Sequence, residues 1–190
     1  MRIIAVTNIK GGVGKTTTAV NLAYLCAAGG ERTVLWDLDP QGAASWILRA
    51  DPSRRALTHE LATADPGTTG RVLPTAYPNL SVIPADDPYR DLDEERAAQN
   101  SPTVQLLRMR RPLAGQCDTL FMDCPPGISL LTDSVLRGVD ALIVPLVPAP
   151  LSVRMLDELV EYVTMQQWPD LKLLPMFSMV DWRKKVHLSG

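Results

Sequence analysis

The sequence lacks any long hydrophobic run and any recognisable leader. A membrane-spanning helix needs about 18 consecutive apolar residues, and no stretch of the 190 residues reaches that length. The N-terminus leads directly into a short strand-like apolar run at residues 3–6 instead of a signal peptide. We therefore expect a cytoplasmic protein.

Cysteine and net charge are both low. The three cysteines, Cys26, Cys117 and Cys124, are odd in number, have no C-x-x-C spacing and lie in apolar surroundings, which predicts reduced thiols in the core. The formal net charge of −2 argues against a generally basic surface for nucleic acids. A local basic patch stays compatible with that charge.

Length and composition predict one globular domain over residues 1–190. A chain of this size buries about 70% of its unfolded surface. Apolar residues make up 46% and charged residues 21%, which excludes a disordered or membrane class. The sequence shows neither internal repeats nor a linker that would separate two cores.

One glycine-rich stretch, KGGVGKTT at residues 10–17, organises the chain. It follows the first apolar run and precedes a helix-like run at residues 19–28. Its glycines leave no Cβ in the way, so backbone N–H groups can turn inward on an anion at the positive end of the following helix. We expect phosphate contacts from Lys10, Gly11, Gly12, Val13, Gly14, Lys15, Thr16 and Thr17.

Two side chains in this stretch have chemistry of their own. Lys15 would place a positive charge near the β- and γ-phosphates of a nucleotide, and the Thr16 hydroxyl is placed to bind Mg²⁺. The usual pattern G-x-x-x-x-G-K-[ST] requires glycine at position 9, where Ile9 stands, and a second lysine, Lys10, comes before the glycine pair. The alternative is a glycine-rich turn with surface lysines, but strand, glycines, Gly-Lys-Thr and helix occur in the required order.

Hydrophobic patterning predicts alternating strands and helices. The expected strands are residues 2–8, 33–37, 80–83, 119–123, 141–146 and 173–180, and the expected helices are residues 16–28, 57–62, 103–111 and a segment from about residue 152. This order indicates the α/β class, with a predominantly parallel doubly wound sheet and helices on both faces.

Carboxylates follow two of the apolar strands. Asp37 and Asp39 end the second strand, and Asp123 ends a run that is apolar enough to be buried on both faces. Ligands of doubly wound sheets bind beyond the carboxyl ends of the strands. Asp123 is therefore expected to hold Mg²⁺, through water, and the alternative for each carboxylate is a purely structural strand end or helix cap.

The motifs resemble those of a known family. Together KGGVGKTT, DLDPQG at residues 37–42 and DCPPG at residues 123–127 resemble the ParA/MinD superfamily of deviant Walker-type P-loop ATPases. VPLVPAP at residues 144–150 looks most like the short ParA proteins that partition plasmids or position cargo. The resemblance implies ATP and Mg²⁺ as ligands and a weak, partner-stimulated ATPase.

The resemblance also assigns roles to individual residues. It implies that Lys15 and Lys10 serve catalysis and that Asp39 positions the attacking water. Asp37 would lie nearer the metal, with Thr16 and Asp123, and Asp181 would approach the base. Lys10 would cross a nucleotide-sandwich homodimer to the partner's phosphates, in a role like that of an arginine finger.

The same resemblance implies a function. We expect an ATP-dependent dimer that binds DNA without sequence preference, associates with the nucleoid and is released when a ParB-like protein stimulates hydrolysis. No membrane partner is expected. The alternatives are a membrane-cycling ATPase like MinD and an ATP-dependent synthetase that uses the same P-loop.

The length of the chain and two basic clusters bear on the DNA binding that the resemblance implies. The family continues past residues 179–181 through another strand and terminal helices, so residues 1–190 are expected to be either truncated or naturally short. Arg108, Arg110 and Arg111 fit either a solvated helix end or a contact to DNA or a partner. Arg183, Lys184 and Lys185 fit either a solvated chain end or the start of a basic surface for DNA.

Overall fold

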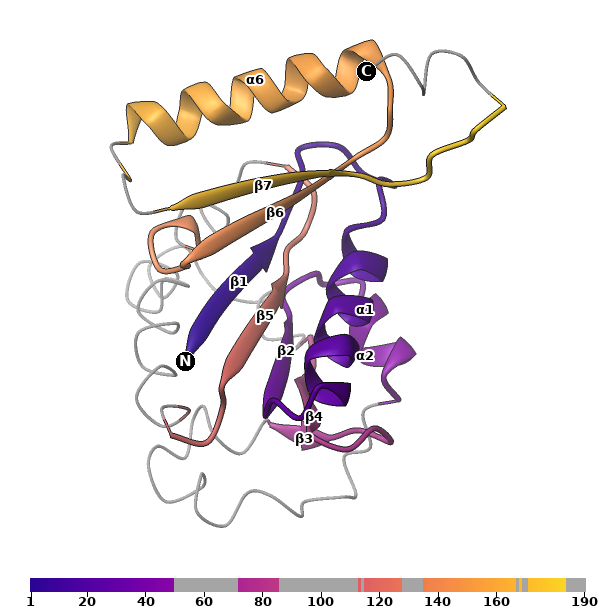
Figure 1. Cartoon of the computed structure of the whole chain (residues 1–190), viewed down its shortest axis with the longest axis vertical. Helices are drawn as coiled ribbons and strands as arrows, with labels where there is room; N and C mark the ends of the chain where they lie inside the picture. The colour runs from indigo at the N-terminus through magenta and orange to yellow at the C-terminus, as the bar shows by residue number, and fades with distance from the viewer. Residues whose placement is uncertain are drawn as a thin grey trace.

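Seven strands form one sheet in the order β3-β4-β2-β5-β1-β6-β7 (Figure 1). The computed structural model describes residues 1–49, 72–85, 113, 115–127, 135–166, 168 and 171–183. The strands are β1 (Arg2–Val6), β2 (Thr33–Asp37), β3 (Leu73–Pro74), β4 (Leu80–Ile83), β5 (Thr119–Asp123), β6 (Ala141–Leu146) and β7 (Lys172–Phe177). Every neighbouring pair is parallel except β3 and β4, which confirms the predominantly parallel sheet.

Helices cover the two faces of this sheet. They are α1 (Lys15–Ala28), α2 (Ala43–Ile47) and α6 (Pro150–Met165). α1 buries the small side chains Ala19, Ala23 and Ala27 in a core that also contains α2. On the opposite face, Leu159 of α6 belongs to a second core. The sheet is therefore doubly wound, as predicted.

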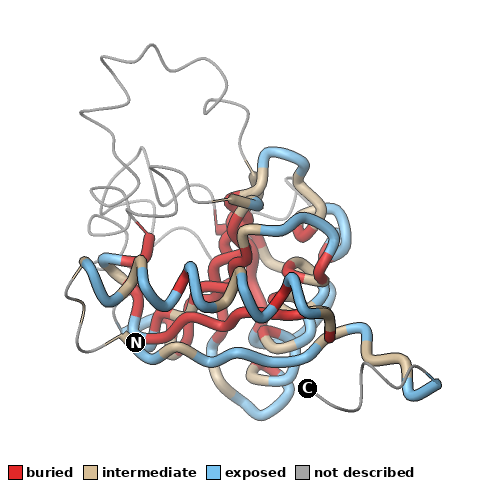
Figure 2. The backbone as a smooth tube through the Cα atoms, turned by 90° about the horizontal axis from the view of Figure 1, so that it is seen from above, coloured by how far each residue is buried: buried red, intermediate tan, exposed pale blue. Residues whose placement is uncertain are grey.

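The central strands carry both cores. All five residues of β2 and of β5 are buried, because side chains that alternate along a strand point to opposite faces and each face is covered by helix. Figure 2 shows this as buried backbone at the centre of the molecule, with exposed stretches on α6 and along β7. Within the described residues, no helix is long and apolar enough to cross a bilayer.

Sequence patterning located most of these elements. The strands expected at residues 33–37, 80–83, 119–123 and 141–146 are confirmed, and α1 begins one residue before the expected start. α2 and the two-residue β3 were not predicted, since both are too short for a periodic pattern. The helices expected at residues 57–62 and 103–111, the arginines at 108, 110 and 111, and Lys184 and Lys185 lie outside the described residues.

Two expected strands have different ends. β1 stops at Val6 instead of residue 8, because the chain turns out of the sheet and only Thr7 still donates its N–H to the carbonyl of Ile143, 3.1 Å away. β7 covers residues 172–177 instead of 173–180, because Met179 adopts a left-handed backbone with φ of 54°. A left-handed residue cannot continue a strand.

β7 is an edge strand with unusual exposure. Its side chains are mostly exposed, including Leu174, Met176 and Phe177, and no described strand pairs with its outer side. The N–H groups of Lys172 and Ser178 point to β6, so the alternate residues between them face the free edge. Pro175, which has no N–H, is one of these outward residues.

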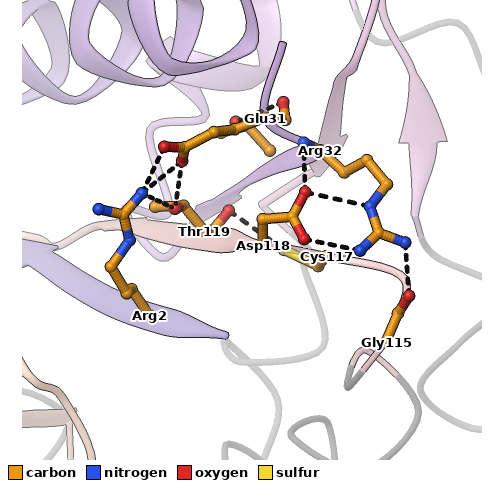
Figure 3. Close-up of polar contacts among 8 residues, drawn as sticks. Arg2, Glu31, Arg32, Gly115, Cys117, Asp118 and Thr119 are labelled. Atoms are coloured by element: carbon orange, nitrogen blue, oxygen red, sulfur yellow. Dashed lines mark hydrogen bonds and ion pairs between the residues drawn. The ribbon is translucent and has the colours of Figure 1, made fainter. Parts of the chain in front are cut away.

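A polar network ties the amino ends of the three central strands together (Figure 3). Arg2 donates to Glu31 and to Thr119, and the Thr119 hydroxyl also donates to Glu31, 2.7 Å away. Arg32 donates through two nitrogens to the two oxygens of Asp118, at 3.1 and 2.6 Å. The hydrogen bonds from Arg32 lower the pKa of Asp118 to about 2, so the stabilising effect of this pair is lost only as the pH falls below about 4.

The cysteines lie where the composition predicted. Cys117 and Cys124 are buried, Cys26 is partly buried, and all three are free thiols. Burial raises the pKa of Cys117 to about 11. A thiol with that pKa is almost entirely protonated near neutral pH, so it behaves as a small apolar side chain.

Candidate functional site

The parallel register brings the carboxyl ends of three strands to one place. Val6 of β1 and Asp37 of β2 are both register partners of Asp123 of β5. The glycine-rich loop follows β1 at this same edge of the sheet and runs into α1. Residues predicted from separate motifs therefore meet at the carboxyl edge of the sheet, where ligands of doubly wound folds bind.

The loop between β1 and α1 has the backbone that a phosphate cradle requires. Gly12 and Gly14 adopt φ angles of 71° and 87°, in the left-handed region that side chains other than glycine rarely adopt. A Cβ added at Gly11 or Gly12 would have no atom within 4 Å, so the loop is open above both glycines. An anion could approach the backbone closely at this opening.

The two lysines of the loop differ in their surroundings. Lys15 is buried, and its Nζ lies 3.4 Å from the carbonyl oxygen of Lys10, so its side chain reaches back along the loop. Lys10 is exposed. One ammonium thus belongs to the loop's own interior, while the other is available to the outside.

Asn8 fixes the start of the loop where β1 leaves the sheet. Its side-chain amide donates to the carbonyl of Pro145, 2.7 Å away, and its side-chain oxygen accepts the N–H of Lys10 at 2.8 Å. Asn8 is buried, and its side chain replaces the next bond of the ladder to β6. The loop therefore begins from a fixed point.

Asp123 is a buried carboxylate for which the described residues provide no hydrogen-bond partner. It is 0% exposed, and neither oxygen has a hydrogen bond of normal geometry to a described residue, although the Thr16 side chain is near enough to lower its pKa. Burial is the main cause that raises the pKa of Asp123 to about 7, and the charges of Asp37 and Asp39 raise it further. Lys15 acts in the opposite direction. A cation at this point would compensate the buried charge.

Asp37 serves the neighbouring loop. One of its oxygens accepts the N–H and the hydroxyl of Ser45, at 2.8 and 2.6 Å, and the other accepts the N–H of Asp39 at 3.2 Å. Ser45 in turn accepts the N–H of Ala85 at 3.0 Å. Burial nevertheless raises the pKa of Asp37. These contacts fix the loop that carries Asp39, while metal binding by Asp37 stays a prediction.

Asp39 and Asp181 occupy different positions relative to this centre. Asp39 is partly buried, and its Oδ1 accepts the N–H of Gln41 at 3.0 Å, which shapes the turn before α2. Asp181 accepts the backbone N–H of Arg183 at 3.1 Å and pairs with its guanidinium at 2.9 Å. A contact of Asp181 with a base stays a prediction.

The donor set fits one magnesium ion shared with a phosphate. Mg²⁺ keeps several waters and takes one or two carboxylates together with phosphate oxygens, rather than a cage of protein ligands. Asp123 and Thr16 fit that requirement, because Asp123 is buried, unpaired and close to Thr16. In the part of the chain that the structure describes, no cluster of three or more acidic, histidine or cysteine side chains offers a different metal site.

Comparison with known proteins identifies the family. The family model described as an AAA domain matches residues 1–172. The chain belongs to this family. Among its relatives, the chromosome partitioning protein ParA of Myxococcus xanthus is 35% identical over 184 residues, which cover 93% of this chain and 65% of that protein. The sporulation initiation inhibitor protein Soj of Bacillus subtilis is 37% identical over 147 residues, covering 76% and 57% respectively.

A solved structure extends the likeness to the fold. Cobyrinic acid a,c-diamide synthase from Mycobacterium smegmatis, crystallised with ADP and magnesium, has a TM-score of 0.79 and 30% identity over 98% of this chain and 78% of that one. These comparisons place the chain in the ParA/MinD superfamily of P-loop ATPases. The chain spans 57 to 65% of the length of the two curated relatives.

Three residues of this candidate site were not predicted. They are Asn8, Ser45 and Ser178, whose side chains hold the two loops that carry the predicted residues. Asn8 was counted as part of the first strand, although it directly precedes the loop. Ser45 and Ser178 have no local sequence signal, because their partners lie elsewhere in the chain.

The unpaired charge of Asp123 leads to a stability prediction. Its folded pKa of about 7 lies above the unfolded value near 3.9, so this group destabilises the fold increasingly as the pH rises from about 4 to 7. Without metal or nucleotide, Asp123→Asn is expected to be more stable than the wild type at pH 8 by about 1–4 kcal/mol. The difference should shrink at pH 5.

Urea unfolding in EDTA at both pH values measures this difference. Asp157→Asn, which removes an exposed aspartate on α6, is the matched control and should show no such change with pH. A variant at position 123 that is no more stable than the wild type at pH 8 would contradict the account of a buried, uncompensated carboxylate.

Proposed function

We propose that this chain binds ATP with Mg²⁺ at the loop of residues 10–17 and hydrolyses it. The observation that carries the proposal is the buried, unpaired carboxylate of Asp123, beside Lys15 and Thr16 at the open end of a glycine loop. A positively charged loop and an uncompensated carboxylate together suit a nucleotide phosphate and its metal ion. The ADP and magnesium of the similar synthase structure support the same ligands.

The residues divide the chemistry between them. Backbone N–H groups of the loop and the Lys15 ammonium would bind the β- and γ-phosphates, while Thr16 and Asp123 would hold the ion, Asp123 through water. When bound, Mg²⁺ supplies charge neutralisation of the phosphate oxygens. Asp39 would orient the water that attacks the γ-phosphorus in line with the leaving ADP oxygen. Asp37 would lie near the metal and keep the loop of Asp39 in place.

Lys10 would complete the site of a second copy. Lys15 already occupies the interior of its own loop, and a second ammonium there would be repelled. Lys10 is exposed, so it is available to a nucleotide in a facing protomer. In this arrangement ATP binding and homodimer formation favour each other by linkage.

The named relatives support a role beyond ATP hydrolysis. ParA of M. xanthus is a chromosome partitioning protein, and the similarity extends over most of this chain. We propose a ParA-type cycle in which the ATP dimer binds DNA without sequence preference on the nucleoid. A ParB-like protein would stimulate the weak ATPase and release the dimer, which would distribute a plasmid, a chromosome or a protein cargo.

A second candidate is an ATP-dependent synthetase. The similar structure of cobyrinic acid a,c-diamide synthase favours it, because 30% identity covers 98% of this chain. The two functions share the nucleotide site and differ in the molecule that stimulates ATP turnover. A synthetase turns over ATP when it meets a small carboxylic acid and an amine donor, whereas a partition ATPase responds to DNA and a protein partner.

DNA binding separates these functions. With ATP and Mg²⁺, the chain is expected to shift a DNA duplex of arbitrary sequence, and the affinity should fall steeply between 50 and 200 mM salt because counterions are released. ADP in place of ATP is the control and should give much weaker binding. ATP turnover that responds to small carboxylic acids and ignores DNA would support the synthetase instead.

Substitution of the two lysines should give different defects. Lys15→Ala is expected to abolish nucleotide binding, since it removes the cation inside the loop. Lys10→Ala should bind ATP with wild-type affinity and fail to dimerise. Titration with a fluorescent ATP analogue and size-exclusion chromatography with ATP measure the two properties. An ATP-dependent dimer of Lys10→Ala would remove the proposed contact across the dimer.

Asp39→Ala should separate binding from hydrolysis. Without a group to orient the water, this variant is expected to retain ATP, hydrolyse it at least tenfold more slowly and accumulate the dimer. Phosphate release and the dimer fraction report the two effects. Asp157→Ala serves as the control for removal of an acidic side chain. Turnover at the wild-type rate would show that another residue positions the water.

A further inference from the structure

The turn after β7 lies directly against the glycine loop. The N–H of Ser178 donates to the carbonyl of Leu146, 2.8 Å away, which fixes the backbone of Ser178 to the end of β6. Its hydroxyl donates to the carbonyl oxygen of Val13 at 2.6 Å. A Cβ added at Gly14 would lie 3.6 Å from the Ser178 hydroxyl and 3.7 Å from the Met179 methyl carbon. The contact is therefore one of packing as well as hydrogen bonding.

The Val13 carbonyl that accepts the Ser178 hydroxyl belongs to the same peptide as the N–H of Gly14. The peptide between Val13 and Gly14 is trans, so its C=O and the N–H of Gly14 point in opposite directions. With the C=O held toward Ser178, the N–H of Gly14 faces away from the β7 turn. No described residue accepts this N–H, whereas the Gly14 carbonyl is used by Thr18 in the first turn of α1.

We propose that Ser178 is a positioning residue for phosphate binding, because its hydroxyl fixes the peptide that directs the Gly14 N–H into the cradle. The inference rests on the proposed nucleotide site and names a residue outside its motifs. Because Gly14 has no Cβ, positive and negative φ angles are about equally accessible to it, and it adopts a φ of 87°. The hydrogen bond from Ser178 therefore favours one orientation of the peptide between Val13 and Gly14.

The turn is built to hold the hydroxyl in place. Met179 adopts a φ of 54°, a backbone conformation that is unfavourable for a residue with a side chain. Asp181 closes the turn by accepting the N–H of Arg183 at 3.1 Å. Met179 lies between the contacts of Ser178 and that of Asp181. These contacts hold it in its unfavourable conformation, in which the Ser178 hydroxyl points to the glycine loop.

Ser178 complements Asn8 at the other end of the loop. Asn8 holds the N–H of Lys10, where the chain enters the loop, and Ser178 holds the carbonyl of Val13, just before α1 begins. Asn8 is itself part of the segment that forms the loop, whereas Ser178 lies in the turn after β7, 165 residues after Val13. Phosphate binding is thereby linked to the placement of β7.

The test compares nucleotide affinity in Ser178→Ala and Ser178→Thr. Loss of one hydrogen bond should weaken Mg-ADP binding about 3- to 10-fold in Ser178→Ala, while Ser178→Thr, which keeps the hydroxyl, should stay within about twofold of the wild type. Mg-pyrophosphate, which has no base or ribose, should lose affinity for Ser178→Ala by the same factor. A fluorescent ADP analogue, displaced by each ligand, gives the affinities.

The control is Ser81→Ala, which removes the hydroxyl of a buried serine in β4. It should leave Mg-ADP binding unchanged, and thermal unfolding without ligand shows that each variant is folded. Wild-type affinity in Ser178→Ala, an equal loss in Ser178→Thr, or a loss for Mg-ADP without one for Mg-pyrophosphate would each overturn the inference. Failure of the wild-type chain to bind Mg-ADP would instead overturn the proposed function, and the inference with it.

Discussion

The parallel pairing of β5 between β1 and β2 is the constraint on which the site depends. It sets Asp123 beside Val6 and Asp37, at the point where β1 turns into the glycine loop. The pairing covers both edges of β5 and the two cores cover its faces, so the carboxylate of Asp123 is removed from water. A charged carboxylate in that position destabilises the fold, and a bound cation, alone or shared with a phosphate, would compensate its charge.

The two ends of the sheet use charge in opposite ways. At the amino ends of the strands, Arg2 and Arg32 meet carboxylates in paired and mostly exposed contacts. At the carboxyl ends, the acidic side chains lie close enough for Asp37 and Asp39 to raise the pKa of Asp123. The charged side chains are thus paired at the amino ends of the strands, where they hold the sheet together. At the carboxyl ends the carboxylates are left without balancing charge, and a bound cation would supply it.

Local motifs were sufficient to predict the loop, the central strands and the meeting of Asp37, Asp39 and Asp123. The loop depends on neighbouring residues, and parallel strands place their carboxyl ends at the same edge of the sheet whatever their order. The supports of the site were not predicted, because Ser178 meets Val13 across 165 positions and Ser45 meets Ala85 across 40. Such contacts depend on strand order and on turns, which hydrophobic periodicity does not encode. The exposure of β7 was also missed, since its apolar residues read like those of a buried strand.

Pro175 disfavours the addition of another strand to the outer edge of β7. An incoming strand would find the outward N–H groups of Leu173 and Phe177, but no donor at the position between them. The ladder of hydrogen bonds between β7 and the incoming strand would therefore be interrupted at its middle, whereas a strand edge without proline offers an uninterrupted row of N–H groups. The exposed apolar side chains of this strand are thus presented on a backbone that aggregating chains extend poorly. Only a partner whose own backbone tolerates that gap could pair along the full length of β7.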